Sequence, residues 1–307
     1  MEIPDVEIFS ALLHRIESHD ELPYRTSAEE VEDFFRSTSE HSTIGGFINN
    51  ELQCYGYVRL KDDAEVIATC QGGVDPRFRG RGIGRALVTW QTEEAQRLLA
   101  EAGAQSRKIA FQVEQGYSDL EAHLIELGYE WVRTFYDLRA PLDQEIHEIE
   151  LGPFLTIKPW NDFDEESIWQ TANRVAQENH SASAQTMDLW MAGRAAFRPG
   201  WSFVAVDSSG DRPLIAGFLM ASKYAQDWSV LGWREGTIDM LGLLQDYRDT
   251  HLAAALVAAT MRAQMKDGMQ AVSAGLSSRN HTSALSIYDS LGFTTVSTAR
   301  LYMLEYS

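Results

Sequence analysis

The chain is poor in several features that would point to particular classes of protein. Its 307 residues include only two cysteines, Cys54 and Cys70, and each falls in a predicted strand. We interpret both as buried, reduced side chains rather than as a catalytic thiol. The sequence has no apolar run of about 18 residues, so no membrane-spanning helix is predicted. His, Cys and carboxylate residues nowhere show the spacing of metal ligands, so we expect no metal site.

Basic residues are also scarce. Lys and Arg number 26 against 45 Asp and Glu, which gives a net charge of −19. A nucleic-acid partner is disfavoured because phosphate backbones bind basic surfaces. The acidity favours a cationic or amine substrate through electrostatic steering, and it equally fits a role in solubility alone. Residues 1–5 lack the basic start and apolar core of a signal peptide, so we expect a cytoplasmic protein with no membrane partner.

The stretch 74–87 carries the strongest local signal in the first half of the chain. It predicts a strand, a glycine-rich turn and a helix. The glycines alternate along the turn, at Gly80, Gly82 and Gly84. Because glycine allows close approach or positive φ, and because the first amides of a helix are unpaired, such a turn suits a phosphate. Three arginines supply charge that can pair with phosphate: Arg79, Arg81 and Arg85.

Two common phosphate-binding motifs do not fit this turn. A P-loop ends in Gly-Lys-Ser/Thr, which is absent. A dinucleotide fingerprint needs a third glycine at the position that Arg85 occupies. On the residues alone, a tight turn with a solvated arginine face stays open as an alternative.

The second half of the chain repeats the first. Three landmarks recur, at offsets of 161, 164 and 169 residues: Gly56 with Gly217, Leu127-Gly128-Tyr129 with Leu291-Gly292-Phe293, and Arg79 with Arg248. A near-constant offset over half the chain indicates a duplicated domain. We predict a layered α/β fold with an N-terminal domain at 1–140, a linker at 141–154 and a C-terminal domain at 155–307.

Two motifs carry a resemblance to the GNAT acyltransferases. Residues 79–84, Arg-Gly-Arg-Gly-Ile-Gly after Val-Asp-Pro, are similar to the family's acetyl-CoA pyrophosphate loop. Residues 280–293, an Asn followed by an Ala-x-x-x-Tyr helix and Leu-Gly-Phe, resemble its second signature. Together the two copies resemble tandem GNAT N-acetyltransferases, including the architecture of the mycothiol synthases. This resemblance implies two GNAT domains, each a mixed, mostly antiparallel sheet flanked by helices.

The resemblance also implies an activity: direct acetyl transfer from acetyl-CoA to a primary amine of a small molecule. In that activity Tyr288 would protonate the departing thiolate, Asp239 would act as base, and Asn280 would lie near the pantetheine–phosphate arm. Backbone amides near Val74 or Leu243 would hold the acetyl carbonyl oxygen. The cofactor-binding residues implied are Gly73, Val74, Arg79, Gly80, Arg81, Gly82, Ile83, Gly84, Arg85, Leu243 and Asn280. On pattern alone, Tyr288 also fits a core aromatic, and Asp239 fits an ion pair with a neighbouring base.

The two copies have kept different parts of this pattern. In the second copy, Asp249 and His251 stand where the first has Gly80 and Gly82. In the first copy, Leu124 stands where the second has Tyr288, and leucine cannot donate a proton. We therefore expect the first copy to hold acetyl-CoA in a monomer whose copies form an internal pseudo-dimer. A non-catalytic acetyl-CoA-binding module with a pseudoenzyme domain, and an interaction scaffold, are the alternatives.

Overall fold

The computed structural model describes residues 6–36, 40–62, 66–104, 107–178, 184–248, 250–277 and 281–306. The chain divides into two compact units. The first comprises residues 1–135 and 298–307, and the second comprises residues 136–297. Within the described ranges, no helix is long and apolar enough to cross a membrane.

The first unit contains a mixed sheet. Its strands, in spatial order, are β1 (His41–Ile48), β2 (Glu51–Asp62), β3 (Val66–Val74), β4 (Arg107–Glu114) and the end of β11 (Thr294–Tyr306). β3 and β4 run parallel, and the remaining neighbours run antiparallel. Parallel neighbours need a crossover connection, which helix α3 (Ile83–Glu101) provides. A further strand, β5 (Glu130–Pro141), begins in this unit and ends in the second.

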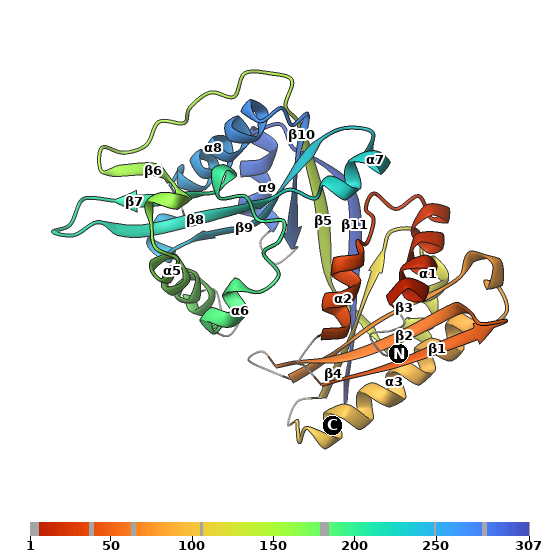
Figure 1. Ribbon diagram of the computed structural model, residues 1–307. Coiled ribbons are helices and arrows are strands. Elements are labelled where there is room, and N and C mark those ends of the chain that lie inside the picture. The colour runs from red at the N-terminus through yellow and green to blue at the C-terminus, as the bar shows by residue number, and fades with distance from the viewer. Residues whose placement is uncertain are drawn as a thin grey trace. The chain divides into compact units, whose positions relative to one another are not determined.

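Helices cover both faces of this sheet (Figure 1). α1 (Val6–His19) and α2 (Ala28–Arg36) lie on one side, and α3 lies on the other. Side chains of β2 alternate between these faces, as expected for a strand. Tyr55 packs against Phe9 of α1 with their ring centroids 4.7 Å apart, whereas Val58 belongs to the apolar cluster that includes α3 and α4 (Ser118–Glu126).

The second unit has the same construction. Its strands, in spatial order, are the end of β5, β10 (Ala271–Ser277), β9 (Glu235–Leu243), β8 (Leu214–Ser222), β7 (Phe203–Asp207) and β6 (Leu155–Pro159). β9 and β10 are parallel, while β6, β7, β8 and β9 pair antiparallel. The helices are α5 (Glu165–Glu178), α6 (Met187–Met191), α7 (Trp228–Leu231), α8 (Leu252–Lys266) and α9 (His281–Ser290).

Alternation along β8 again separates two apolar clusters. Phe218 and Met220 belong to the cluster that contains Ile168 and Val175 of α5. Leu219 and Ala221 belong to the cluster that contains the buried face of α8. In Figure 1, α5 and α8 accordingly lie on opposite sides of the strands. The predicted α/β fold, with mixed and mostly antiparallel strands flanked by helices in each unit, is confirmed.

The short helices α4 and α9 show that the repeat is real at the level of single hydrogen bonds. The Tyr129 N–H donates to the Leu124 carbonyl over 3.0 Å, and the Phe293 N–H donates to the Tyr288 carbonyl over 3.1 Å. The glycine in each of these helix ends has a positive φ, 88° at Gly128 and 86° at Gly292. Leu124 is therefore the structural counterpart of Tyr288, as the sequence offset predicted.

The predicted correspondence between Gly56 and Gly217 is wrong by two residues. Gly217 pairs with Leu243 at the end of β9, whereas at the end of β3 the residue paired with Val74 is Cys54. Cys54, and not Gly56, is thus the counterpart of Gly217. The glycine at position 56 is explained by packing in its own unit, since a Cβ there would lie 3.2 Å from the Trp90 ring.

The limits of the compact units differ from the predicted division at 1–140, 141–154 and 155–307, which stays a prediction. Residues 299–306 of β11 pair antiparallel with residues 107–114 of β4, so the last strand of the chain belongs to the first unit. Residues 142–154, all of them described, contain no helix or strand, consistent with a connecting segment.

A buried ion cluster holds the end of β3 in the first unit. Asp75 has no exposed surface, and its carboxylate accepts bonds from Arg15 Nε over 2.6 Å and Arg77 Nη2 over 2.8 Å. Hydrogen bonds from Arg77, and then from Arg15, outweigh burial and hold the pKa of Asp75 well below its usual range. Arg15 also donates to the Leu52 carbonyl over 2.7 Å, so the cluster ties α1 and β2 to the turn after β3.

We expect Asp75→Ala to lower the free energy of unfolding of the first unit by about 2 kcal/mol at pH 7, because it removes the buried carboxylate that Arg15 and Arg77 share and leaves them the exposed Glu51. The folded-state pKa of Asp75 is below its unfolded value of about 3.9, so its stabilisation is present above that pH and is lost as the pH falls. The difference between variant and wild type should therefore shrink below about pH 4. Urea denaturation followed by circular dichroism at several pH values measures both effects.

The control is Glu101→Gln, which removes an exposed partner of Arg97 and should change stability by about 0.5 kcal/mol or less. Equal effects of the two substitutions would contradict the assignment of Asp75 as an anchor.

Candidate functional site

In each unit, the parallel strand pair separates before its strands end. The ladder between β3 and β4 joins residues 67–70 to 108–111, although β3 continues to Val74 and β4 to Glu114. The ladder between β9 and β10 joins residues 235–238 to 271–274, although these strands continue to Leu243 and Ser277. Beyond these points the facing backbone groups of the two strands do not bond each other. An extended ligand can therefore pair with them.

The predicted turn of the first unit lies directly after this opening. Gly80 and Gly82 have φ values of 72° and 82°, in the left-handed region that glycine favours. A Cβ built at Gly80, Gly82 or Gly84 would meet no atom within 4 Å. Gly82 is also the N-cap of the 19-residue helix α3, and no side chain of the described residues caps that end. The turn therefore presents open space beside uncapped helix amides, which fits a pyrophosphate.

The three arginines of the turn differ in what they contact. Arg79 is held by Asp20, with Nη1 and Nη2 donating to the two carboxylate oxygens over 2.6 and 2.7 Å. Arg81 lies over the Phe78 ring, 5.0 Å from its centroid. Arg85 is exposed and lies 3.7 Å from Glu126 in a loose ion pair. Arg81 and Arg85 thus have charge to offer a phosphate, whereas the guanidinium of Arg79 is already engaged.

Gly73 and Val74 take part in packing and in the turn itself. A Cβ at Gly73 would lie 2.7 Å from Ile16 Cδ1 and 2.9 Å from the Tyr55 ring, so the packing of α1 explains this glycine. The Val74 carbonyl accepts a bond from Arg79 Nε over 3.1 Å. Ile83 is the first residue of α3.

The corresponding turn of the second unit is closed. His251, the N-cap of α8, has a φ of −73° where Gly82 has +82°. The Thr250 hydroxyl accepts a bond from the Leu252 N–H over 3.3 Å, so the first amide of α8 already has a partner. Ala253, the counterpart of the exposed Gly84, is buried. Asp249 lies outside the described residues.

Asp239 occupies a β-bulge in the second unit. Met240 pairs with Met220 and Ile238 pairs with Ala221, so Asp239 is the extra residue between two paired neighbours. Its Oδ2 accepts a short hydrogen bond from the Ser222 hydroxyl, and its Oδ1 accepts a longer one, 3.4 Å, from the Tyr224 hydroxyl. Asp239 follows Ile238, the last residue of the β9–β10 ladder, so it stands at the point where the strands separate.

Asp239 is exposed, and its carboxylate is contacted by Ser222 and Tyr224. Burial raises the pKa of Asp239, and the bonds from Ser222 and Tyr224 oppose that rise without cancelling it. A carboxylate with a raised pKa at an accessible bulge has the properties of a general base.

Tyr288 lies in the apolar cluster that contains Leu256 of α8. It is 5% exposed, and its ring meets Phe293 edge to face at 5.0 Å. Burial raises the pKa of Tyr288 to about 12, so the phenol stays protonated at neutral pH. Both expectations for this residue, core aromatic and proton donor, are compatible with this environment. Asn280 lies outside the described residues. Leu243, another predicted cofactor residue, is buried and paired with Gly217.

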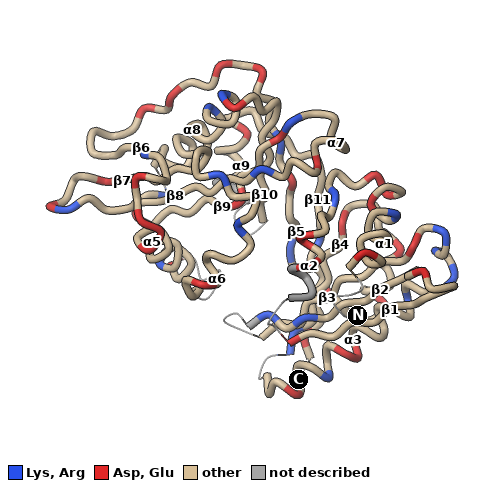
Figure 2. The backbone as a smooth tube through the Cα atoms, in the orientation of Figure 1, with Lys and Arg blue, Asp and Glu red and all other residues tan. Residues whose placement is uncertain are grey.

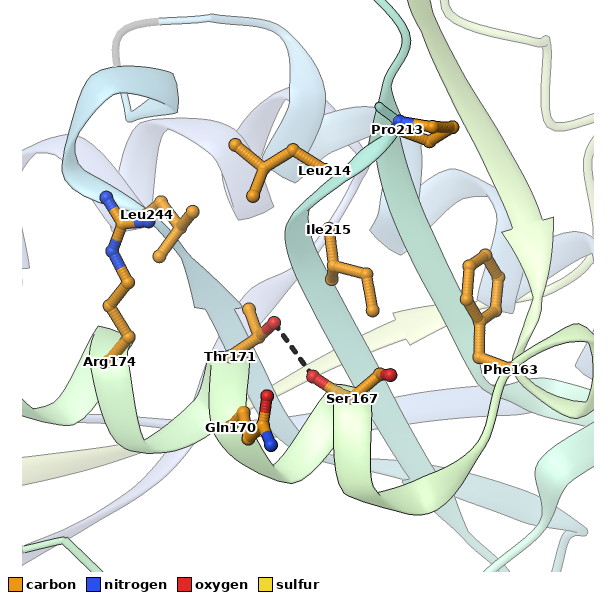
Figure 3. Close-up of a pocket in the computed structure, with 9 residues that line it drawn as sticks. All are labelled: Phe163, Ser167, Gln170, Thr171, Arg174, Pro213, Leu214, Ile215 and Leu244. Atoms are coloured by element: carbon orange, nitrogen blue, oxygen red, sulfur yellow. Dashed lines mark hydrogen bonds between the residues drawn. The ribbon is translucent and has the colours of Figure 1, made fainter. Parts of the chain in front are cut away.

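The second unit also has a hollow of about 440 Å³ between α5 and the start of β8 (Figure 3). Its walls are Phe163, Ser167, Gln170, Thr171, Arg174, Pro213, Leu214, Ile215 and Leu244. The N–H of Leu244 donates to the Ala216 carbonyl just as that of Asp75 donates to the Gln53 carbonyl, so Leu244 is the counterpart of Asp75. The hollow is therefore lined in part by the residue that corresponds to Asp75. None of the predicted site residues lines it.

Two residues beside the predicted sites escaped the sequence analysis, Asp20 and Ser222. Neither belongs to a motif, and each lies far along the chain from its partner. Among the described residues, no group of three or more His, Cys, Asp or Glu side chains could hold a metal ion. Acidic residues occur on helices and loops of both units (Figure 2).

Known proteins resemble this chain in sequence. The family model for the acetyltransferase (GNAT) family matches residues 9–115. The mycothiol acetyltransferase of Streptomyces bingchenggensis is 28% identical over 260 residues, which cover 81% of this chain and 77% of that protein. The mycothiol acetyltransferase of Salinispora arenicola is 25% identical over 253 residues, which cover 78% of this chain and 74% of that protein.

Solved structures share the fold along nearly the whole chain. A tandem GNAT protein from the clavulanic acid biosynthesis pathway has a TM-score of 0.75 at 15% identity, covering 99% of this chain and 97% of its own. A GCN5-related N-acetyltransferase from Sphaerobacter thermophilus has a TM-score of 0.72 at 19% identity, covering 99% and 94%. The family match in the first unit, the relatives that extend over four fifths of the chain and the tandem fold of the solved structures together support a two-domain GNAT acetyltransferase.

Proposed function

We propose that this acetyltransferase moves an acetyl group from acetyl-CoA to a primary amine of a small molecule, with the chemistry in the second unit. The observation that carries the proposal is Asp239, an accessible carboxylate of raised pKa on the bulge where β9 and β10 separate. A carboxylate in that place attracts a protonated amine and accepts its proton. The relatives are named mycothiol acetyltransferases, which supports a small acceptor molecule.

The first unit is proposed to bind acetyl-CoA by the turn at 79–85. The open glycines at 80, 82 and 84 and the uncapped start of α3 support this assignment. Arg81 and Arg85 supply positive charge there. This unit has no counterpart of Tyr288, because Leu124 takes that position.

The acetyl-CoA that reacts is proposed to bind in the second unit, between the separated ends of β9 and β10. We expect this binding to be weaker than that of the first unit, because the turn before α8 is closed. The hydroxyl of Ser277, the last residue of β10, is buried and has no partner among the described residues, so a ligand in this region can satisfy it. When bound, acetyl-CoA supplies the acetyl thioester.

The proposed chemistry uses two residues of this unit. Asp239 takes a proton from the ammonium group of the acceptor, and the free amine nitrogen bonds to the thioester carbon as the carbon–sulfur bond breaks. Tyr288 donates its phenolic proton to the departing sulfur. The acylated nitrogen then releases its second proton, which returns through solvent to the Tyr288 phenolate, and Asp239 gives its proton to water. The raised pKa of Tyr288, about 12, keeps that proton in place until a strong base forms nearby.

A specific observation favours a second candidate, a protein that binds CoA without turnover. The open turn and the tyrosine lie in different units, since the second unit has the closed turn and the first has Leu124. Release of CoA thiol from acetyl-CoA in the presence of a mixed set of amines, including the amine precursors of mycothiol-type compounds, separates the two candidates. Amine-dependent release supports the transferase, and binding without release supports the second candidate.

Gly82→Glu is expected to abolish tight CoA binding, because it places a bulky negative charge in the open space of the turn and strains a backbone with φ of 82°. Titration calorimetry with CoA measures the effect. Gly103→Glu is the matched control, since Gly103 has φ of 65°, faces equally open space and follows the other end of α3. Unchanged affinity in Gly82→Glu would exclude the turn as the tight site.

Tyr288→Phe and Asp239→Asn are each expected to lower amine-dependent turnover by roughly 10²–10⁴-fold, the range of general acid and base catalysis, without altering CoA binding to the first unit. Steady-state kinetics combined with calorimetry on the same variants checks this separation. If Tyr288→Phe stays fully active while Gly82→Glu is inactive, the chemistry belongs to the first unit.

Ser222→Ala is expected to move the acid limb of the kcat/KM profile to higher pH, because the variant removes a donor that lowers the pKa of Asp239. Asp239 works as a base only when deprotonated, so activity rises with pH through its pKa. Ser222→Thr keeps a hydroxyl and should keep the limb near its original place. An acid limb that does not move in Ser222→Ala would argue that Asp239 is not the base.

A further inference from the structure

Asp20 is the centre of a cluster that joins three loops of the first unit. It lies after α1, and its side chain is 10% exposed. Its carboxylate accepts two bonds from Arg79 of the glycine turn and one, of 2.6 Å, from the Tyr117 hydroxyl. Tyr117 is the N-cap of α4, directly after Gly116, whose φ is 105°. The His19 ring nitrogen lies 3.0 Å from the same carboxylate.

The chain around Asp20 is fixed from both sides. Glu17, which is buried, accepts bonds from the backbone and the hydroxyl of Thr26. Arg25 donates to the carbonyls of Leu22 and Tyr24 over 3.0 and 2.8 Å. Glu21 has a φ of 51°, an uncommon value for a residue with a side chain. A rigid loop therefore delivers this carboxylate to the glycine turn.

The electrostatics of the cluster make the contact between Asp20 and Arg79 a firm one. Burial alone would raise the pKa of Asp20, but the bonds from Arg79, Tyr117 and His19 outweigh it and hold that pKa well below its usual range. The contact is bidentate, which fixes the plane of the guanidinium as well as its position. Arg79 Nε in turn donates to the Val74 carbonyl, so the last residue of β3 and the turn are held together.

This arrangement assigns Arg79 a role that differs from phosphate binding. We propose that Asp20 and Tyr117 are positioning residues for CoA in the first unit: they hold Arg79 so that Arg79 shapes the turn, while the amides of the turn receive the pyrophosphate. The proposal rests on the proposed binding of CoA at this turn. The alternative is that Asp20 only neutralises Arg79, which would otherwise bind phosphate. The two roles predict effects of opposite sign.

The test is CoA binding by calorimetry on the full chain. Asp20→Asn keeps the size of the side chain but loses the carboxylate that accepts both guanidinium nitrogens, so it should weaken the tight site by about tenfold or more. Arg79→Lys keeps the charge but loses the bidentate contact, and it should weaken binding by a similar factor. Because Asp20 and Arg79 act through one shared contact, the double variant should bind CoA no more weakly than either single variant.

Salt dependence provides a readout that a general loss of stability would not change. Arg79→Gln should weaken CoA binding without changing how affinity falls with ionic strength, because Arg79 does not touch phosphate. Arg81→Gln should reduce that dependence. Glu94→Gln is the matched control: Glu94 also receives two nitrogens of an arginine, Arg97, on α3 away from the turn, and this variant should bind CoA like the wild type.

The results separate this proposal from the assignment of the site itself. If the wild type has a tight CoA site that Gly82→Glu removes, and Asp20→Asn binds CoA as tightly as or more tightly than wild type, Arg79 is a phosphate ligand and the positioning role is wrong. Additive losses in the double variant overturn it as well. If the wild type has no tight CoA site, the cofactor assignment fails first, and the positioning role falls with it.

Discussion

The early end of the parallel ladder is the constraint on which both candidate sites depend. In each unit only four residue pairs join the two parallel strands before they separate. Backbone amides and carbonyls are strong hydrogen-bonding groups, and a site that leaves them without a partner strand must offer them to something else. A helix begins close to the end of one strand of each pair, so the opening ends beside a helix N-terminus. The fold therefore places an edge for an extended ligand next to a site for an anion.

The two units have used this common geometry differently. In the first, positive φ values at Gly80 and Gly82 turn the backbone so that no Cβ fills the space before α3. In the second, Thr250 binds the first amide of α8 and Ala253, the counterpart of Gly84, is buried. The second unit has instead placed an extra residue, Asp239, at the opening, whereas β2 and β3 keep a regular register. Under the proposed function, cofactor holding and proton transfer thus fall to separate copies.

Much of this architecture was predictable from the sequence because it depends on short-range patterns. The helix of 83–101, the glycine turn and the matching ends of α4 and α9 all follow from spacing within about ten residues. The pairing of β11 with β4 was not predictable, because an apolar strand pattern does not state which neighbour it will choose. The bulge at Asp239 was invisible for a related reason: register belongs to two strands and not to one.

The contacts that define the sites were the hardest to predict. Arg79 looked like a phosphate ligand because its neighbours in the chain fit that motif, yet its partner Asp20 is 59 residues away. Nothing in the pattern around Asp20 distinguishes it from the other acidic residues of a chain with a net charge of −19. The bidentate contact between Asp20 and Arg79 exists only in the folded chain, where these distant residues come together. Sequence reasoning therefore located the turn correctly and overestimated how many of its charges are available.

The raised pKa of Asp239 also bears on which acceptors suit the second unit. An alkylammonium group has a pKa of about 10, as in lysine. Because the pKa of Asp239 is raised, the gap between the two pKa values is smaller, and proton transfer from the ammonium to the carboxylate is less unfavourable. The incoming ammonium would lower the pKa of Asp239 by its own charge and so keep the base deprotonated while the acceptor binds. An uncharged acceptor such as an alcohol would give neither the attraction nor this adjustment. If Asp239 is the base, as proposed, its environment favours a cationic amine over a neutral hydroxyl compound, in the same direction as the negative charge of the whole chain.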